Sequence, residues 1–154
     1  MIWYKIIQQL ESKNEDYVLV NETGMGRVHR LWLKGDKAGK RDIFTDELPG
    51  TPDNIRFDGE GTFWIAMPSL RADLDALATL PRLRALLSFL PISALEAAAQ
   101  PGSFVIGVNL EGEVVHNLQD QDNPFHYITG VTPCGNNLYL GSLQTEAIGV
   151  LPRP

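Results

Sequence analysis

Cysteine is nearly absent from this 154-residue sequence, in which Cys134 carries the single thiol. One cysteine cannot form an internal disulfide bond, and it cannot build a cysteine-rich zinc site. Cys134 also falls in an expected hairpin turn, where no neighbouring group would activate a nucleophile. We therefore expect Cys134 to be chemically inert.

Basic residues are also scarce, with 13 Lys and Arg against 19 Asp and Glu, which gives a net charge of −6. Binding to a nucleic-acid backbone depends on a positively charged surface. We therefore expect no nucleic-acid partner. The acidity suits a divalent cation or a cationic ligand, although it is equally typical of an ordinary water-exposed surface.

Long hydrophobic runs are missing as well. The apolar start of the chain, residues 1–7, is too short for a transmembrane helix or a signal peptide, and Gln8 and Gln9 interrupt it. On this basis we predict a cytoplasmic protein. The GxSxG elbow, the Gly-rich phosphate loop and the HExxH zinc motif are also absent, so the sequence names no reaction.

The sequence does contain one strand unit in three copies. Each copy has a central strand rich in aromatic and β-branched residues, and a polar turn precedes it. The central strands are residues 17–22, 63–68 and 138–143, and a further strand follows each at 27–33, 104–108 and 147–151. A strand-like piece also starts ten residues upstream of each copy, near Ile7, Asp53 and Ile128. The first two units add a fourth strand at 41–44 and 113–118.

The spacing of these units predicts a β-propeller. The copies begin at residues 17, 63 and 138, and the longer second interval contains an additional segment at about 70–101. Without that segment, both intervals have the length of a four-stranded propeller blade. We predict an all-β half-propeller in one domain, 1–154, with blades at about 3–46, 52–119 and 126–151. Since complete propellers have about four to eight blades, we expect self-association, with a homodimer as the simplest closed ring.

The additional segment, residues 70–101, has a helical pattern. Leucines recur in it at helical spacing, while Pro81 and Pro91 divide it into short helices. Ser93 and Glu96 have the spacing of a capping box. We expect a short helical insertion that covers the propeller. The alternative is an interfacial membrane contact made by the leucine face.

Asp53 and Asn54 are the main candidates for a binding site. They stand at the expected start of an inner strand, the strand of a propeller blade that lines the central channel. Carboxylate and amide oxygens are hard donors of the kind that Ca²⁺ takes. Asx residues after a proline are also common turn caps. The residues alone therefore leave metal binding and turn capping open.

The histidines are the candidate bases. His29 and His116 alternate with apolar residues in expected strands, so we expect surface or cross-strand positions for both. His126 stands beside Phe125 and Tyr127 at the entry to the last inner strand. It is the histidine that we expect to reach the channel.

Several motifs together resemble a known family. They are DYVLVNETG at 16–24, RLWLKG at 30–35 with KAG at 37–39, LPGTPDNI at 48–55, PRLR at 81–84, and LYLGS at 138–142 with IGVL at 148–151. In this combination the chain resembles the C-terminal half of a strictosidine synthase-like protein. The resemblance implies a six-bladed propeller of the calcium-dependent phosphotriesterase group, whose relatives include paraoxonases and gluconolactonases.

The resemblance implies roles for several residues. Asp53 and Asn54 match the Asp–Asn pair that binds the central calcium ion in paraoxonase-like members. A further calcium-binding Asn would fall near Ile7 or Gln8, and neither residue matches. The catalytic Glu of true strictosidine synthases corresponds to Thr129, which cannot act as a carboxylate acid or base. The Pictet-Spengler reaction of the namesake enzyme is therefore not expected.

Three functions remain open at this stage. The first is a small-molecule binding protein whose channel contains Asp53, Asn54, His126 and Thr129, and the second is a vestigial half-propeller without activity. The third is a lactonase- or esterase-like hydrolase that uses a metal ion at Asp53 and Asn54. We place binding or a vestigial role before catalysis. If the chain is catalytic, His126 and Thr129 are the candidate residues.

Overall fold

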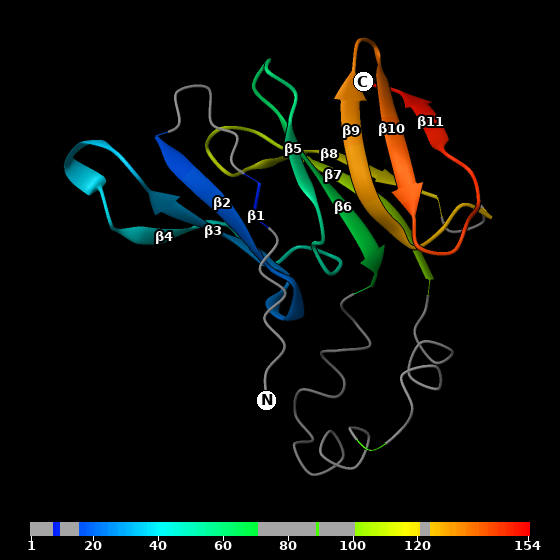
Figure 1. The fold of residues 1–154 in the computed structure, drawn as a ribbon, viewed down its shortest axis with the longest axis horizontal. Helices are drawn as coiled ribbons and strands as arrows, with labels where there is room; N and C mark the ends of the chain where they lie inside the picture. The colour runs from blue at the N-terminus through cyan, green and yellow to red at the C-terminus, as the bar shows by residue number, and fades with distance from the viewer. Residues whose placement is uncertain (1–7, 10–15, 71–88, 90–100, 121–123) are drawn as a thin grey trace.

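The computed structural model describes residues 8–9, 16–70, 89, 101–120 and 124–154. In these ranges the regular structure is almost entirely β-strand and forms three antiparallel sheets (Figure 1). The prediction of an all-β chain with three antiparallel blades is therefore confirmed. The expected helical insertion at about 70–101 lies outside the described residues, apart from Leu70, Phe89 and Pro101.

Each sheet corresponds to one repeat of the sequence. Sheet 1 has the order β1 (Gln8–Gln9), β2 (Tyr17–Glu22), β3 (Arg27–Trp32) and β4 (Arg41–Thr45), with short 3-10 helices η1 (Thr23–Met25) and η2 (Gly35–Lys37) in its connections. Sheet 2 has the order β5 (Ile55–Phe57), β6 (Phe63–Ser69), β7 (Pro101–Val108) and β8 (Val114–Gln119). Sheet 3 has the order β9 (Ile128–Cys134), β10 (Asn137–Ser142) and β11 (Gly149–Pro152).

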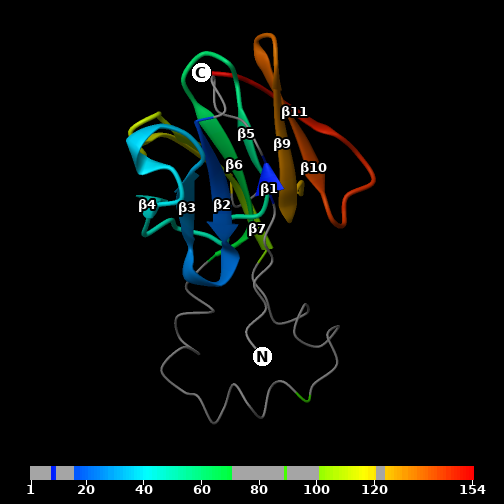
Figure 2. The same cartoon turned by 60° about the vertical axis from the view of Figure 1, so that its left-hand side comes forward.

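The sheets are arranged like the segments of a fan. Figures 1 and 2 show the first strands of the three sheets, β1, β5 and β9, near one another, whereas β4 and β11 lie at opposite sides. Within the described ranges, each sheet follows chain order from its first strand outward. This is the strand order that the repeat analysis predicted.

The middle sheet is buried on both faces. In β6, Phe63, Ile65 and Met67 belong to the apolar cluster shared with sheet 1, while Trp64 and Ala66 belong to the cluster shared with sheet 3. All five side chains are at most 2% exposed. Because successive strand residues point to opposite faces, a strand between two neighbouring sheets has to be apolar at every position. This requirement explains the uninterrupted run from Phe63 to Met67.

The two apolar clusters join the sheets in sequence. The cluster between sheets 1 and 2 contains Leu19, Val28, Phe44, Leu48, Ile55, Phe63, Ile65, Met67, Phe104, Ile106 and Val108. The cluster between sheets 2 and 3 contains Trp64, Ala66, Val105, Ile128, Val131, Leu138 and Leu140. Burial of this apolar surface holds the three sheets together without help from disulfide bonds.

An ion-pair network ties the end of the chain to the β5–β6 turn. The guanidinium of Arg153 lies 3.4 Å from the Asp58 carboxylate and 2.6 Å from that of Glu60. Burial by itself raises the pKa of Asp58. The charged form is favoured by hydrogen bonds from the backbone N–H groups of Thr62 and Glu60 and from the Trp64 indole, and by the positive charge of Arg153. Together these interactions leave the pKa of Asp58 below its usual value. Asp58 is thus a structural residue that joins sheets 2 and 3.

Candidate functional site

Asp53 and Asn54 lie directly before β5, so the inner strand begins two residues later than predicted. The two residues still pair with β6, because the Asp53 N–H donates to the Ala66 carbonyl and the Ala66 N–H donates to the Asn54 carbonyl, each at 2.9 Å. Asp53 is only 5% exposed. The predicted pair is therefore held rigidly at the start of the strand, where the buried Asp53 carboxylate requires compensation.

The pair lies where the three sheets meet. The Asn21 side chain, at the end of β2, donates from Nδ2 to the Asp53 carbonyl at 2.5 Å. The Asn54 side chain donates from Nδ2 to the carbonyl of Thr129, in β9, at 2.6 Å. Asn21, Asp53, Asn54 and Thr129 thus connect sheets 1, 2 and 3, and we call this group the three-sheet junction.

Local hydrogen bonds hold the segment that leads into the junction. The Thr23 hydroxyl, in η1, donates to the Pro52 carbonyl at 2.8 Å. On the other side, the Thr51 N–H donates to the Ser69 carbonyl at 3.0 Å, and the hydroxyls of the two residues lie 2.8 Å apart. These bonds fix the backbone on both sides of Pro52, so the position of Asp53 follows from sheets 1 and 2 together.

Asn21 has an unsatisfied polar atom at the junction. The residue is 2% exposed, and among the described residues its Oδ1 has no hydrogen-bond partner. A buried amide oxygen without a partner costs about 1–3 kcal/mol, so such atoms are rare unless a ligand, ion or water satisfies them. The Asn21 oxygen therefore marks the junction as a place that can accept a cation or a hydrogen-bond donor.

Asn21 was not among the site residues predicted from the sequence, although a signal for it was present. Asn21 is two residues after the buried Leu19 in the same strand, and its register partner is the buried Val28. It therefore occupies a position on the apolar face of β2. A polar residue in an apolar stripe points to a specific partner.

The donor atoms at the junction are of the kind that a hard cation prefers. One carboxylate, from Asp53, and amide oxygens from Asn21 and Asn54 match the oxygen ligands of Ca²⁺, which takes six to eight. In the described part of the chain, no group of three His, Cys, Asp or Glu side chains gathers in one place. These oxygen atoms are therefore of the type that binds calcium. They would form part of a ligand set in which Asp53 supplies the negative charge.

The two candidate catalytic residues lie near the start of β9. Thr129 is half-buried and takes part in the junction through its backbone carbonyl. The His126 ring lies against Tyr127 with the ring centres 5.5 Å apart, and the His126 carbonyl accepts a hydrogen bond from the Ser142 hydroxyl at 2.6 Å. These two contacts of His126 are with Tyr127 and Ser142, on its own connection and on β10.

The other histidines have structural contacts, as the alternation in their strands predicted. His29 lies 2.7 Å from the Glu22 carboxylate, which also accepts from Arg27 at 2.6 Å. The hydrogen bond from Arg27 is the main cause that lowers the pKa of Glu22 below its usual value, and His29 lowers it further. Glu22 follows Asn21 in β2 and points to the opposite face, away from the junction. His116 stacks on Trp64, with ring centres 5.2 Å apart.

The fold and the junction define a class of protein. Three antiparallel sheets arranged like blades, with polar side chains where their first strands begin, are typical of a β-propeller with its site at the central channel. In the part of the chain that the structure describes, no helix is long and apolar enough to cross a membrane.

The chain is similar to strictosidine synthase-like proteins and to adipocyte plasma membrane-associated proteins. The chain is 35% identical over 146 residues to strictosidine synthase-like 10 of Arabidopsis thaliana, covering 90% of this chain and 39% of that protein. It is 33% identical over 144 residues to the adipocyte plasma membrane-associated protein of Rattus norvegicus, covering 89% of this chain and 38% of the relative. Strictosidine synthase-like 6 of Arabidopsis thaliana is 35% identical over 133 residues, which is 86% of this chain and 34% of the relative. No protein-family model matches the chain.

These similarities make the chain a partial match to the strictosidine synthase-like family, as the motifs predicted. The match extends over nearly all of this chain, but the chain spans only a little over a third of the length of these relatives.

Proposed function

We propose that this chain is a strictosidine synthase-like propeller segment that binds a small molecule at the three-sheet junction without the chemistry of the family's namesake enzyme. The unpartnered Oδ1 of the buried Asn21, next to Asp53, is the observation that carries the proposal. It supplies an acceptor that only an additional group can satisfy. Thr129, at the position that the resemblance assigns to the catalytic Glu, offers a hydroxyl in place of a carboxylate.

We further propose that a calcium ion forms part of this site. Asp53 would hold the ion through its carboxylate, and Asn21 and Asn54 would hold it through their amide oxygens. A bound calcium ion would supply a positive charge that orients and polarises an oxygen atom of the ligand. The protein's own contribution is the fixed backbone around Pro52, which sets the donor atoms before the ligand arrives.

Calorimetric titration of the purified chain with calcium chloride tests the metal proposal. We expect saturable heat with the wild type and binding at least tenfold weaker with Asp53→Asn, because calcium affinity depends on the number of charged ligands. Asp46→Asn is the matched control, since Asp46 is exposed and follows β4. Equal affinity in both variants, or no heat with the wild type, would exclude calcium at Asp53. Far-UV circular dichroism verifies that each variant is folded.

A metal-dependent hydrolase is the second candidate, and the buried Asp53 carboxylate favours it. In this case the metal ion at the junction would act as a Lewis acid on a lactone or ester. A panel of lactones and aryl esters separates the two functions. Turnover that requires calcium and is lost in Asp53→Asn would establish the hydrolase. Thermal shifts with ligands, in the absence of turnover, would establish binding.

We also propose that two copies of the chain associate through the outer faces of sheets 1 and 3. Large apolar side chains remain exposed there, with Leu31 and Ile43 at 37% and 49% on sheet 1 and Tyr139 and Val150 at 40% and 56% on sheet 3. By strand alternation, these side chains point away from the two apolar clusters. Contiguous exposed apolar side chains mark interaction surfaces, and a two-fold axis is the commonest closed arrangement.

Light scattering after size-exclusion chromatography tests the dimer. We expect about twice the 17.1 kDa mass of one chain for the wild type, and a monomer for Ile43→Lys, which introduces a charge into the proposed interface. Val114→Lys is the control, because Val114 is exposed to a similar extent, 47%, but lies on β8 of the middle sheet. A monomeric wild type at high protein concentration would disprove the association.

A further inference from the structure

Exposed positive charge on this chain is concentrated in one hairpin. In the part of the chain that the structure describes, the exposed basic side chains are Lys34, Lys37, Lys40 and Arg41, which lie between β3 and β4 and at the start of β4. The other arginines in that part are half-buried. Figure 1 shows this connection at the outer edge of the molecule. We call residues 33–41 the basic hairpin.

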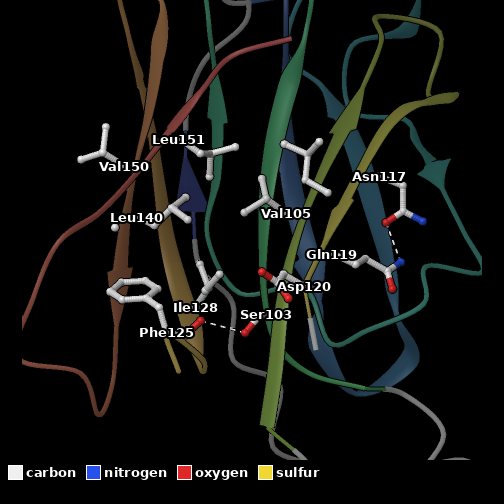
Figure 3. Close-up of a pocket in the computed structure, with 12 residues that line it drawn as sticks. Ser103, Val105, Asn117, Gln119, Asp120, Phe125, Ile128, Leu140, Val150 and Leu151 are labelled. Atoms are coloured by element: carbon white, nitrogen blue, oxygen red, sulfur yellow. Dashed lines mark hydrogen bonds between the residues drawn. The ribbon is translucent and has the colours of Figure 1, made fainter. Parts of the chain in front are cut away.

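Exposed negative charge is spread over the rest of the described surface. Sheets 2 and 3 carry exposed acidic residues in their turns and connections, namely Glu60, Glu111, Glu113, Asp120 and Glu146. Figure 3 shows one of them, Asp120, beside the cavity between these two sheets. Residues 34–41 contain a single acid, Asp36, against four basic residues. The basic hairpin is therefore a local positive region in a chain whose net charge is −6.

Backbone hydrogen bonds hold the basic hairpin in one shape. The Trp32 N–H donates to the Lys40 carbonyl at 3.0 Å, and the Gly39 N–H donates to the Trp32 carbonyl at 2.9 Å. At the base of the hairpin, the Leu33 N–H donates to the Asp16 carbonyl at 2.7 Å, which ties it to the start of β2. The backbone is thus ordered before a partner arrives, and this order lowers the entropy cost of binding.

Asp42, the acid that follows the basic hairpin, is bound to other residues of sheet 1. Its carboxylate accepts two hydrogen bonds from the Arg30 guanidinium and one from the Trp32 indole, each at 3.0 Å. The hydrogen bond from Arg30 is the main cause that lowers the pKa of Asp42 below its usual value. Because Arg30 and Trp32 bind both oxygens of Asp42, this carboxylate does not cancel the positive charge of the basic hairpin.

A short anionic partner suits this surface better than an extended one. A bilayer or a nucleic acid would also face the rest of the chain, where acidic residues are twice as numerous as basic ones outside residues 34–41. Binding at a membrane interface also uses exposed aromatic side chains. The Trp32 indole is not available for this, because its N–H is bound to Asp42 and the cations of Arg30 and Lys37 lie over its ring. A segment of a few residues would contact the basic hairpin alone.

We propose that the basic hairpin binds a short acidic segment of a partner protein. Carboxylates of the segment pair with Lys37, Lys40 and Arg41, and an apolar side chain of the segment packs on Leu33, which is 42% exposed. Exposed ion pairs are individually weak, so binding requires several of them together and is readily reversible. This surface is separate from the three-sheet junction, so each proposal can fail without the other.

Two peptides that differ in charge alone test the proposal. The first has the sequence Asp-Glu-Leu-Asp-Glu and the second the sequence Asn-Gln-Leu-Asn-Gln, and both are blocked at their ends. Each is titrated into the isotope-labelled chain while amide NMR shifts are recorded. We expect the acidic peptide to shift the amides of residues 33–41 and the neutral peptide to bind about tenfold more weakly, as several exposed ion pairs would give. Higher salt concentration should reduce this difference.

Variants of the chain locate the surface. Combining Lys37→Gln with Lys40→Gln removes two charges and should weaken binding of the acidic peptide about three- to tenfold. Combining Lys37→Arg with Lys40→Arg is the matched control, because it retains both charges and should bind like the wild type. Since these side chains are exposed, we expect all variants to fold, and circular dichroism verifies this.

Several results would overturn the proposal. Equal affinity for the acidic and the neutral peptide would remove the role of charge, and shifts confined to residues outside 33–41 would place the peptide elsewhere. Sedimentation of the chain with phosphatidylserine vesicles, without binding of the acidic peptide, would show that the basic hairpin contacts a membrane surface. Shifts of residues 33–41 on dilution of the chain without peptide would show that a second copy occupies the hairpin.

Discussion

Replacing Gly112 with alanine is expected to lower the free energy of unfolding by about 3–5 kcal/mol. Gly112 lies in the β7–β8 turn with φ of +94°, and a Cβ atom there would lie 1.8 Å from the backbone carbonyl oxygen of Phe44. That overlap involves backbone atoms of sheet 1, which cannot rotate away. The variant therefore has to separate sheets 1 and 2 locally. Urea denaturation followed by circular dichroism measures the loss.

The control for this prediction is Gly135→Ala. Gly135 lies in the β9–β10 turn with φ of +55°, and no atom lies within 4 Å of the position that a Cβ atom would take. The substitution then costs only the backbone strain of a positive φ, about 1 kcal/mol. A similar loss in the two variants would show that backbone conformation, and not contact with Phe44, makes Gly112 necessary.

The strands were predictable from the sequence because each depends on a local pattern. The run from Phe63 to Met67 is apolar at every position, so the sequence indicates a strand without knowledge of its neighbours. The strands Tyr17–Glu22 and Asn137–Ser142 were predictable for a similar local reason, because a polar turn precedes each of them. The repeat of this pattern then predicted three sheets in chain order.

The junction was only partly predictable, because its contacts join residues far apart in sequence. Asp53 and Asn54 were visible as an Asx pair after Pro52. The contacts that these two residues make were not visible, since Asn21 is 32 residues from Asp53 and Thr129 is 75 residues from Asn54. Thr129 came to attention through family resemblance alone. No local pattern indicates which carbonyl a distant amide will reach.

The same limit applies to Asp58. Asp58 has the local signature of a turn, where its carboxylate accepts from the N–H groups of Glu60 and Thr62. Its contact with Arg153 spans 95 residues and depends on how sheet 3 packs against sheet 2. Tertiary packing determines this contact.

Replacing Trp64 with alanine should also cost about 3–5 kcal/mol, the usual loss for a large buried aromatic side chain. Trp64 is 1% exposed and packs between sheets 2 and 3. Gly107 in β7 pairs with Trp64 in β6 on one side and with His116 in β8 on the other. Because Gly107 has no side chain, the His116 ring can stack on the Trp64 indole. The indole N–H also donates to Asp58 at 3.3 Å, so the residue links the apolar cluster to the Arg153 network.

Two further variants separate these contributions of Trp64 in the same urea experiment. Trp64→Phe retains most of the apolar packing and loses the hydrogen bond to Asp58, so we expect a smaller loss of about 1–2 kcal/mol. Trp32→Ala removes a half-buried indole at the end of β3, where Arg30 and Lys37 lie over the ring, and it should cost about 1–2 kcal/mol. If Trp64→Ala cost no more than Trp32→Ala, the packing of sheet 3 on sheet 2 would not depend on Trp64. A large loss confined to Trp64→Ala would show that burial of this indole is central to the packing of sheet 3 on sheet 2.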